Sequence, residues 1–501
     1  MHECLIGVDI GTQGTKTAVY RSDGVCLADS FEPSVLQHPE PDCTVQNPEE
    51  ILGSVCRTIR VAVDKAGVRP GDIAAIGMDA QMAGILGVRA DGTASTPYDS
   101  WLDVRCSPYV TVMKRAAEKE IIESTGGQVT VNHGTKLLWW MHERSEIYAH
   151  TACFVTLITY VTMRLCGLTA KEAYIDNTHL HFTGFADNTA CRWNEALLHE
   201  FKVEYGKLPR ICRPTELVGG LTASMAQACG LLPGTPVAAG CGDSAASSLG
   251  AGIVRPGQVY DVAGTASIFS CTTSVYTPDT QEKTMLMTRS AVDGLWNALA
   301  YISGGGMCLR WFKGLIGRDY TELDTLAGTA PPGSGGLLFI PHFAGRTCPH
   351  APALRGTWLG LDWQKDTSAL YRSIMESIAY EYRLYLYVLQ SLNKHILPQA
   401  VYGVGGGSRS QLFNQIKADV LELPYHSLSC GDTAAWGSAR IAGVACGLFP
   451  SLSETVARPN VAAIALPQEQ NRAVYRRMSK RYIAALQPQT AIYETIERKG
   501  R

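Results

Sequence analysis

One carboxylate near the middle of the chain stands in a pattern that suits chemistry on a bound group. Asp243 follows Gly240-Cys241-Gly242 and precedes the small-residue run Ser244-Ala245-Ala246. Glycines allow a tight bend and a close approach, so a ligand could come within reach of this carboxylate. An Asp before small residues is also typical of an ordinary helix N-cap. The stretch alone leaves both interpretations open.

Two turns rich in glycine and threonine carry groups that bind phosphate oxygens. Gly11-Thr12-Gln13-Gly14-Thr15-Lys16 separates two apolar runs, and Gly264-Thr265-Ala266-Ser267 lies in a similar place in the second half of the chain. Their backbone N–H groups and hydroxyls can bind phosphate, Lys16 adds a positive charge, and Asp9 could hold the water molecules of a metal ion. A plain β-turn is the alternative, and the pattern by itself does not decide between the two.

A third group of residues suits a ligand rich in hydroxyls. Residues 98–105 combine an aromatic plate, Trp101, with the charged side chains of Asp103 and Arg105. Such a ligand needs apolar contact with its C–H faces and directional hydrogen bonds to its oxygens. The alternative is a surface turn with a half-buried Trp. His179 and His181 have a spacing that could bind metal in a strand, but no third ligand is evident, which favours packing or surface histidines.

The elements expected to position these residues repeat along the chain. Strand, Gly-Thr turn and strand occur over 5–20 and again over 258–267, which indicates two duplicated lobes that hold a nucleotide. The first copy is followed by an expected third strand at 25–29, a helix from residue 48 and a buried strand at 74–78. A strand at 234–240 leads to Asp243 and to a small-residue helix at 245–251. In an open parallel sheet, ligands bind in loops beyond the strand ends.

Further elements follow from apolar spacing and from glycines. Helices are expected at 136–142, 153–168, 307–315 and 368–392 and from residue 433, with a polar, peripheral helix after residue 466. Gly405-Gly406-Gly407 lies between a strand and a helix, where bare backbone would let a base or a phosphate lie close. This run departs from the dinucleotide fingerprint, because no acidic residue follows a strand about twenty residues on.

Composition narrows the class of protein. The 501 residues exceed the size of one core, so two large domains or three smaller ones are expected. Charged residues make up 18%, and 44 basic residues nearly balance 46 acidic ones, which argues against a nucleic-acid partner. The 16 cysteines contain no C-x-x-C pair, which favours reduced thiols and a cytoplasmic protein. The first residues show no basic n-region or cleavage site, so no signal sequence is expected, and the apolar window 153–168 is too short to span a membrane.

Seven motifs in order resemble those of one enzyme family. They are Asp9-Ile10-Gly11-Thr12, Gln81-Met82-x-Gly84, Trp101-x-Asp103-x-Arg105, Lys136-Leu137-Leu138-Trp139, Gly242-Asp243, Gly264-Thr265-Ala266-Ser267 and Gly405-Gly406-Gly407. Over residues 4–447 the chain resembles the FGGY carbohydrate kinases, and among them the xylulose kinases and their pentulose-kinase relatives. Each motif is weak alone, but seven in order make an accidental match very improbable.

The resemblance implies an α/β, two-lobed, actin-like ATPase fold of duplicated ribonuclease-H-like domains, with the active site in the interdomain cleft. Residues 1–250 would form the domain that binds sugar and supplies the catalytic base, and residues 251–501 the domain that binds adenosine. The reaction implied is transfer of the γ-phosphoryl group of ATP to a hydroxyl of a sugar or polyol. Such a transfer needs in-line positioning, neutralised phosphate charge and a carboxylate near the attacking hydroxyl.

The resemblance also assigns roles to individual residues. Asp243 would be the general base and contact the substrate, and Asp9 with Asp243 would hold Mg²⁺. The positions that would meet the phosphates are Gly11, Thr12, Gln13, Thr15, Lys16, Gly264, Thr265 and Gly306. Those that would cradle adenosine are Gly406, Gly407 and Ser410. Those that fall on sugar-binding positions are Gln81, Met82, Trp101, Asp103 and Arg105.

The departures from the family pattern bear mainly on the sugar. Ala83 replaces a histidine that xylulose kinases typically carry, Asp79 adds a carboxylate, and Leu102 replaces a polar residue. In the loop 343–347, Gly345-Arg346 lacks an expected glutamate. Lost hydrogen-bonding groups can change substrate discrimination by orders of magnitude. D-xylulose is the leading substrate, ribulose and erythritol are alternatives, and an actin-like ATPase or a sugar sensor without kinase activity is the rival class. A homodimer remains open.

Overall fold

The structure, a computed structural model, describes residues 4–429, 431–454 and 460–499. These residues form two compact units. Unit 1 contains residues 4–254, 287–296 and 431–454, and unit 2 contains residues 255–286, 297–429 and 460–499. The sequence suggested a single division at residue 250. The units divide near that point as well, but residues 431–454 return to unit 1.

Unit 1 is built on a seven-stranded mixed sheet, with the strand order β13-β14-β5-β1-β2-β3 and with β15 paired to β5. Its central strand β1 is buried on both faces, which is why it consists of a nearly continuous apolar run. It pairs antiparallel with β2 and parallel with β5. The strand bounds are β1 Cys4–Ile10, β2 Gly14–Arg21, β3 Cys26–Pro33, β5 Ile73–Ala80, β13 Leu217–Gly220, β14 Pro236–Ala238 and β15 Cys241–Gly242.

Three helices share a core with this sheet: α1 (Pro48–Ala66), α5 (Leu157–Cys166) and α7 (Ala223–Cys229). α1 begins where the sequence predicts, because Pro48 fixes the first turn and the side chain of Asn47 accepts a hydrogen bond from Glu49 N at 3.0 Å. The single helix expected over 153–168 is wrong. Residues Cys153–Val155 form β8, which pairs with β6, and α5 starts only after Thr156.

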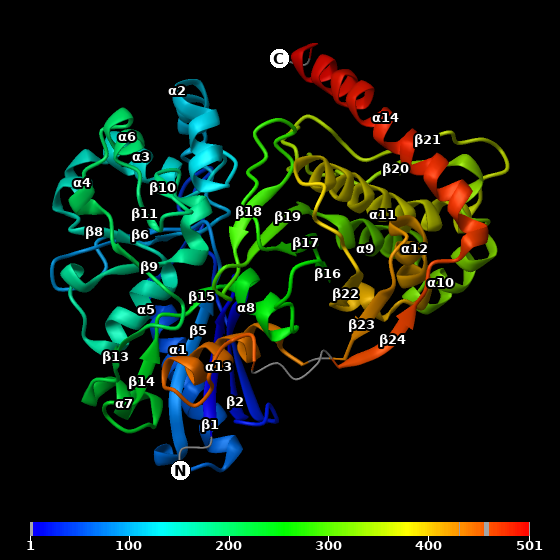
Figure 1. Ribbon diagram of the computed structural model, residues 1–501. Coiled ribbons are helices and arrows are strands. Elements are labelled where there is room, and N and C mark those ends of the chain that lie inside the picture. The colour runs from blue at the N-terminus through cyan, green and yellow to red at the C-terminus, as the bar shows by residue number, and fades with distance from the viewer. Residues whose placement is uncertain (1–3, 430, 455–459, 500–501) are drawn as a thin grey trace. The chain divides into compact units, whose positions relative to one another are not determined.

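Another two helices of unit 1 lie close together, although they are far apart in sequence. α8 (Asp243–Gly250) packs on α13 (Thr433–Ala445), and α13 packs on β1 and β5. Figure 1 shows α13, in orange, beside the blue strand β1. Gly7 and Gly77 are register partners on β1 and β5, and a Cβ on either would overlap a backbone carbonyl of α13. Glycine at these two positions therefore allows the helix to lie directly on the sheet.

A second core in unit 1 carries the loop that contains Trp101. It includes buried residues from α2, α3 and α6, such as Met113, Leu137 and Leu197. The helix predicted at 136–142 is confirmed as α3. The elements of this part are β4 Val45–Gln46, β6 Leu86–Val88, β7 Tyr98–Asp99, α2 Ser107–Thr125, α3 His133–Glu143, α4 Ser145–His150, β8 Cys153–Val155, β9 Tyr174–Asp176, the 3-10 helix η3 Asn177–Phe182, β10 Ala186–Asp187, β11 Arg192–Trp193, α6 Glu195–Glu200 and β12 Arg210–Cys212.

Unit 2 repeats the plan of the first sheet. Its strand order is β19-β17-β16-β22-β23-β24. The central strand β16 pairs antiparallel with β17 and parallel with β22, as β1 does with β2 and β5. The predicted internal repeat is thus confirmed. The bounds are β16 Gln258–Ala263, β17 Ser267–Thr273, β19 Trp296–Ile302, β22 Ala400–Val404, β23 Tyr425–Leu428 and β24 Val461–Ala465, with a separate pair β20 Leu338–Ile340 and β21 Thr357–Leu359. The short strand β18, Leu286–Arg289, consists mostly of residues assigned to unit 1.

Unit 2 has a long central helix, α11 (Thr367–Leu392). The helices that pack against it are α9 Gly305–Ile316, α10 Tyr320–Thr329, α12 Gln411–Leu421 and α14 Glu469–Lys499. The 3-10 helix η6, Gly406–Arg409, contacts α12. The helices predicted at 307–315 and 368–392 are confirmed. The prediction that the last helix is peripheral is wrong: Tyr475 and Tyr482 are fully buried, and their hydroxyls bond Glu376 at 3.0 Å and Glu381 at 2.7 Å.

All fifteen cysteines in the described part of the chain are free thiols. Among the described residues, no helix combines the length and the apolar character needed to span a bilayer.

Candidate functional site

Four aspartates of unit 1 lie close enough to affect one another's pKa values: Asp9, Asp79, Asp243 and Asp432. We call them the aspartate cluster. Asp9 and Asp79 are neighbours in the parallel register of β1 and β5, and Cys241 of β15 pairs with Asp79 on the other side. Asp243 follows two residues after Cys241. The pKa of Asp9 is raised to about 7, first by burial and then by the charges of Asp432 and Asp243, while a hydrogen bond with Asp79 and the charge of Lys16 act to lower it. Burial and the nearby negative charges therefore both disfavour the ionised form of Asp9.

Asp243 occupies the first turn of α8. The N-cap of that helix is Gly242, so the hypothesis that Asp243 is itself the cap is corrected. Its Oδ1 accepts a hydrogen bond from the N–H of Ser244 at 2.6 Å, and its side chain remains partly exposed. Burial raises its pKa to about 6, while the Ser244 N–H and the charge of His179 act in the opposite direction. A carboxylate with such a pKa is ionised at pH 7 and can still accept a proton.

Asp79 is fully buried, which separates it from the sugar-binding positions. Its Oδ2 accepts a hydrogen bond from the Ser438 hydroxyl of α13 at 2.7 Å. Burial, and then the charge of Asp9, raises the pKa of Asp79 well above its usual range. The extra carboxylate noted in the sequence thus belongs to the interior of the aspartate cluster and joins it to α13.

A turn that sequence reasoning did not select holds the segment before Asp243. Gly242 N donates a hydrogen bond to Thr178 Oγ1 at 3.0 Å. Both the hydroxyl and the N–H of Thr178 bond Asp176 Oδ1, and Nδ1 of His179 lies 2.6 Å from Asp176 Oδ2. We call residues 176–179 the aspartate turn. The pattern Asp-Asn-Thr could have signalled an Asx turn, but nothing local in the sequence links it to Gly242.

The histidine pair lies in the same region and is buried. His179 is held by Asp176, and among the described residues its Nε2 has no hydrogen-bond partner. No cluster of three or more His, Cys, Asp or Glu side chains within the described ranges is arranged to hold a metal ion. The interpretation of His179 and His181 as packing histidines agrees with their burial.

The first Gly-Thr turn joins β1 to β2. It closes with a hydrogen bond from Gly11 N to Gly14 O at 3.0 Å, and Gln13 is exposed at its tip. Thr15 is fully buried instead, and its hydroxyl lies 2.7 Å from Ser54 Oγ. Because β2 alternates its side chains, the hydroxyl of Thr15 faces the core and does not face a ligand.

Lys16 forms ion pairs with two carboxylates. Its Nζ lies 3.1 Å from Asp432 and 3.5 Å from Asp29. Burial acts to lower the pKa of Lys16, but the charges and hydrogen bonds of Asp432 and Asp29 raise it. Lys16 is therefore a permanent cation beside the aspartate cluster, and α13 supplies its main partner through the N-cap residue Asp432.

Predicted phosphate and sugar residues are connected in one polar chain. Trp101 Nε1 donates to Thr12 Oγ1 at 2.9 Å, and Thr12 Oγ1 donates to Gln81 Oε1 at 3.2 Å. Gln81 Nε2 then donates to Gln46 Oε1 at 2.7 Å. Gln46 was not singled out from the sequence, because a lone buried glutamine carries no local signal. Trp101 remains half-exposed, so one face of its ring is open to a ligand.

Met82 and Ala83 lie in the loop after β5. Met82 packs against Gly242, where an added Cβ would overlap its thioether, and its sulfur accepts a hydrogen bond from Ser244 Oγ at 3.2 Å. Ala83 has a positive φ of 62°, which is uncommon for a residue other than glycine. The structure thus brings Met82 next to Asp243, as the sugar-site prediction requires.

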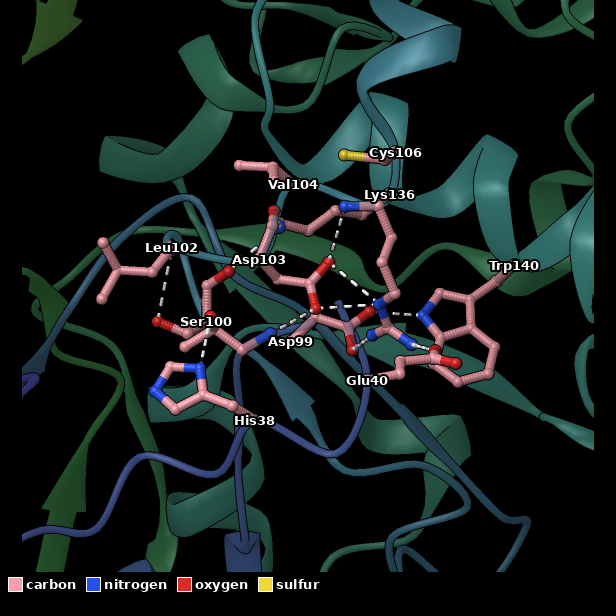
Figure 2. A network of polar contacts seen from close by, with 12 residues as sticks. His38, Glu40, Asp99, Ser100, Leu102, Asp103, Val104, Cys106, Lys136 and Trp140 are labelled. Atoms are coloured by element: carbon pink, nitrogen blue, oxygen red, sulfur yellow. Dashed lines mark hydrogen bonds and ion pairs between the residues drawn. The ribbon is translucent and has the colours of Figure 1, made fainter. Parts of the chain in front are cut away.

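Asp103 and Arg105 bind one another, so their charges are already paired. Figure 2 shows Asp103 within a network of polar contacts. Asp103 is buried and accepts hydrogen bonds from Thr44 N at 2.9 Å and Arg105 Nε at 2.9 Å. Arg105 also contacts Asp99 at 2.8 Å and lies over the Trp139 ring at 4.3 Å. The guanidinium is still partly exposed, whereas Asp103 positions it.

Figure 2 also shows Lys136 and Trp140 of α3 reaching the same loop. Lys136 Nζ donates hydrogen bonds to the carbonyl oxygens of Ser100 at 3.0 Å and Asp103 at 2.7 Å, and Trp140 Nε1 donates to Asp99 Oδ2 at 2.6 Å. Lys136 is almost completely buried. Lys136 of the Lys-Leu-Leu-Trp motif therefore holds the backbone of the Trp101 loop through these two hydrogen bonds.

Unit 2 contains a cavity of about 590 Å³ among three glycine-rich segments. Gly264 and Thr265 come from the turn between β16 and β17, Gly306 from the start of α9, and Gly406 and Gly407 from η6. A Cβ at Gly306 would overlap the Gly264 carbonyl, so the first two segments touch. Ser410 also lines the cavity, as do Tyr320, Asp324, Tyr371 and Phe413. A cavity of this size and lining accommodates a nucleoside with phosphates at its glycine edge.

The duplicated sheets, each with a central strand between a parallel and an antiparallel neighbour, have the topology of an actin-like ATPase fold. Sequence models of the N-terminal and C-terminal domains of the FGGY family of carbohydrate kinases match residues 4–250 and 259–446. The chain belongs to the FGGY family of carbohydrate kinases. Members of this family are phosphotransferases that act on an alcohol group.

Individual relatives span nearly the whole chain. The xylulose kinase of Escherichia coli strain K12 is 26% identical over 476 residues, which cover 94% of this chain and 96% of the relative. The autoinducer-2 kinase of Escherichia coli strain ATCC 8739 is 29% identical over 422 residues, covering 80% and 78%. The crystal structure of a xyloylose kinase from Brucella ovis superposes with a TM-score of 0.90 at 26% identity, covering 98% of this chain and 100% of that one.

Proposed function

We propose that the protein transfers the γ-phosphoryl group of ATP to a hydroxyl of a ketopentose, with D-xylulose as the leading substrate. The observation that carries this proposal is the partly exposed carboxylate of Asp243 at the start of α8, beside Asp9. Its neighbours Gly242 and Ser244 contact Met82. In a carbohydrate kinase, a base at this position is adjacent to residues suited to hold the sugar.

Asp243 acts as the general base in this mechanism. It accepts the proton of the attacking hydroxyl as that oxygen bonds to the γ-phosphorus, and the bond from phosphorus to the leaving ADP oxygen breaks. Its pKa of about 6 leaves it ionised at neutral pH. Base assistance of this kind contributes about 10² to 10⁴ in rate. The half-exposed ring of Trp101 and the partly exposed guanidinium of Arg105 bind the sugar, while Lys136 and Asp103 hold their loop.

Nucleotide binding is assigned to two groups of residues. In unit 1 these are Gly11, Thr12, Gln13 and Lys16, with Thr15 contributing only backbone. In unit 2, Gly264, Thr265 and Gly306 would take phosphates, and Gly406, Gly407 and Ser410 the adenosine. The cavity formed by the unit 2 residues supports this assignment.

A magnesium ion fits the aspartate cluster. Asp9 and Asp243 would supply oxygen ligands. The charge of Asp243 is one of the causes, after burial and Asp432, that raise the pKa of Asp9, so a cation would favour the ionised form of both carboxylates. Mg²⁺ is usually held by one or two carboxylates with water and phosphate oxygens, so two aspartates suffice. When bound, the ion neutralises charge on the transferred phosphoryl group.

The choice of sugar depends on the relatives and on the residues of the sugar site. The relatives named above include both a xylulose kinase and an autoinducer-2 kinase at similar identity. At the sugar site, Ala83 lacks the imidazole typical of xylulose kinases, whereas the buried Asp79 makes no compensating contact. A substrate hydroxyl that the missing histidine would bind is therefore left without that partner, which keeps ribulose and erythritol as alternatives.

A coupled assay of ADP release tests the proposal. We expect release to depend on one of the polyols in a panel of D-xylulose, ribulose, erythritol and their stereoisomers. Asp243→Asn should keep ADP and sugar binding and lose about 10² to 10⁴ in turnover. Asp293→Asn, an exposed carboxylate of unit 1, is the matched control. ADP release that no polyol stimulates would refute kinase activity on these substrates and favour an ATPase without an acceptor.

A further inference from the structure

An aspartate that no motif singled out lies in the wall of the unit 2 cavity. α10 presents Tyr320, Thr321 and Asp324 to this cavity. Residues four apart lie on one helix face, so Tyr320 and Asp324 stand together. The side chain of Asp324 is half-buried. A carboxylate in a ligand cavity is available as a hydrogen-bond acceptor unless the protein already neutralises it.

The polar side chain predicted to meet the nucleoside lies near Asp324. Ser410 is the N-cap of α12, and its Oγ accepts a hydrogen bond from Phe413 N at 3.1 Å. Ser410 and Asp324 both line the cavity, and the Ser410 hydroxyl acts to lower the pKa of Asp324. The cavity wall therefore presents a hydroxyl and a carboxylate to the same ligand.

The surroundings of Asp324 leave its charge uncompensated. Burial raises its pKa, and within the described residues only the Ser410 hydroxyl opposes that effect. The nearby groups with titratable protons are the hydroxyls of Tyr371 on α11 and Tyr320 on α10. Arg310 and Arg409 also line the cavity, but no contact joins either of them to Asp324 among the described side chains. The carboxylate thus keeps free lone pairs.

The charge of Asp324 also decides which end of a nucleotide can lie beside it. A carboxylate repels phosphates, whereas the backbone N–H groups of the three glycine-rich segments attract them. The part of the nucleotide near Asp324 is therefore the neutral nucleoside. Hydrogen-bond donors on a nucleoside are the ribose hydroxyls and the amino groups of the base.

We propose that Asp324 accepts a hydrogen bond from the nucleoside and so selects the nucleotide. This inference rests on the proposed function, in which the unit 2 cavity binds the nucleotide. The donor is either the exocyclic amine of adenine or a ribose hydroxyl. Asp324 acts on binding and takes no part in phosphoryl transfer.

Calorimetric titration with diphosphates tests this without requiring turnover. The probes are ADP, purine riboside diphosphate without the amine, 2′-deoxy-ADP, 3′-deoxy-ADP and GDP. Each is titrated into the wild type, Asp324→Asn, Asp324→Ala and the exposed control Asp293→Asn. A hydrogen bond to a charged acceptor corresponds to about 10- to 100-fold in affinity.

The expected result is a loss of about 10- to 100-fold in ADP affinity for both Asp324 variants and no change for Asp293→Asn. In the wild type, one analogue should show the same loss, and the Asp324 variants should bind that analogue no more weakly than the wild type does. Loss with the purine analogue identifies the amine, and loss with a deoxy analogue identifies the ribose hydroxyl.

Two results would overturn the inference. One is unchanged ADP affinity in both variants. The other is an equal loss for every probe, which would indicate structural damage rather than a lost bond. If neither variant folds, a wild type that binds all the probes alike overturns it. A wild type that binds ADP selectively but phosphorylates no polyol would refute the proposed reaction and still support this role for Asp324.

Discussion

Replacing Thr178 with valine tests whether the aspartate turn holds the base in position. Valine has nearly the shape of threonine but no hydroxyl, and Thr178 is almost fully buried. The change removes the acceptor for Gly242 N, which lies 3.0 Å away, and one of the hydrogen bonds to Asp176. The steric effect is small, so a large response would report the lost bonds.

The expected magnitude follows from those two bonds. An unpaired buried N–H costs about 1 to 3 kcal/mol, and a lost bond to a carboxylate costs about 1.5 to 3 kcal/mol. Because these costs overlap in one network, we expect a decrease of about 2 to 4 kcal/mol in the free energy of unfolding. Gly242 directly precedes Asp243, so its displacement moves the base. A displacement of about 1 Å lowers kcat by roughly 10²-fold.

Two measurements separate the structural effect from the catalytic one. Urea unfolding gives the stability, and the coupled kinase assay gives kcat and the KM for ATP and for sugar. Thr178→Ser keeps the hydroxyl and is the control, with stability and kcat near the wild type. We expect kcat to fall while the KM for ATP stays the same. If Thr178→Val matched Thr178→Ser in stability and in kcat, the aspartate turn would not hold Asp243.

Three other substitutions follow from the structure. Gly306→Ala should lower nucleotide affinity at least tenfold, because its Cβ would overlap the Gly264 carbonyl, whereas Gly314→Ala in the same helix has open space and should bind ADP normally in calorimetry. Trp101→Phe removes the donor to Thr12 and should raise the KM for sugar about three- to tenfold, with the fully exposed Trp363→Phe as the unaffected control in the coupled assay. Burial opposes ionisation of Glu381, but Arg346, His342 and Tyr482 hold its pKa at about 2, below its ordinary 4.5. Its contribution to stability is therefore present above pH 4.5 and is lost as the pH falls toward 2, so acid unfolding should be steeper over that window for the wild type than for Glu381→Gln.

Local patterns predicted the elements whose signals are local. The strand-turn-strand units, the helix from Pro48 and the glycine-rich segments depend on residues adjacent in sequence, and the structure confirms them. The prediction of one helix over 153–168 was wrong because an apolar run does not distinguish a strand from a helix. Only the pairing of Cys153–Val155 with Leu86–Val88 of β6 makes its first residues a strand.

Side-chain partners from distant parts of the chain were beyond local reasoning. Tyr475 and Tyr482 lie in a segment whose polar sequence predicts an exposed tail. Both are buried, and their hydroxyls donate hydrogen bonds to Glu376 and Glu381 on α11. Thr15 lies in the phosphate-type turn, but Ser54 of α1 takes its hydroxyl. A motif specifies which side chains are present, whereas burial and competing partners decide which of them a ligand can reach.

The position of α13 shows how the extra carboxylate Asp79 can be accommodated without changing the sugar site. Gly7 and Gly77 let the helix lie against the sheet, and Ser438 then reaches Asp79. The N-cap residue of the same helix, Asp432, lies beside Lys16. The helix therefore contacts both Asp79 and Lys16. Because Asp79 is fully buried and bonded within this packing, it cannot contact a sugar directly. We therefore expect Ala83 and Leu102, rather than Asp79, to affect substrate choice, because neither of these two side chains can form a hydrogen bond with a sugar hydroxyl.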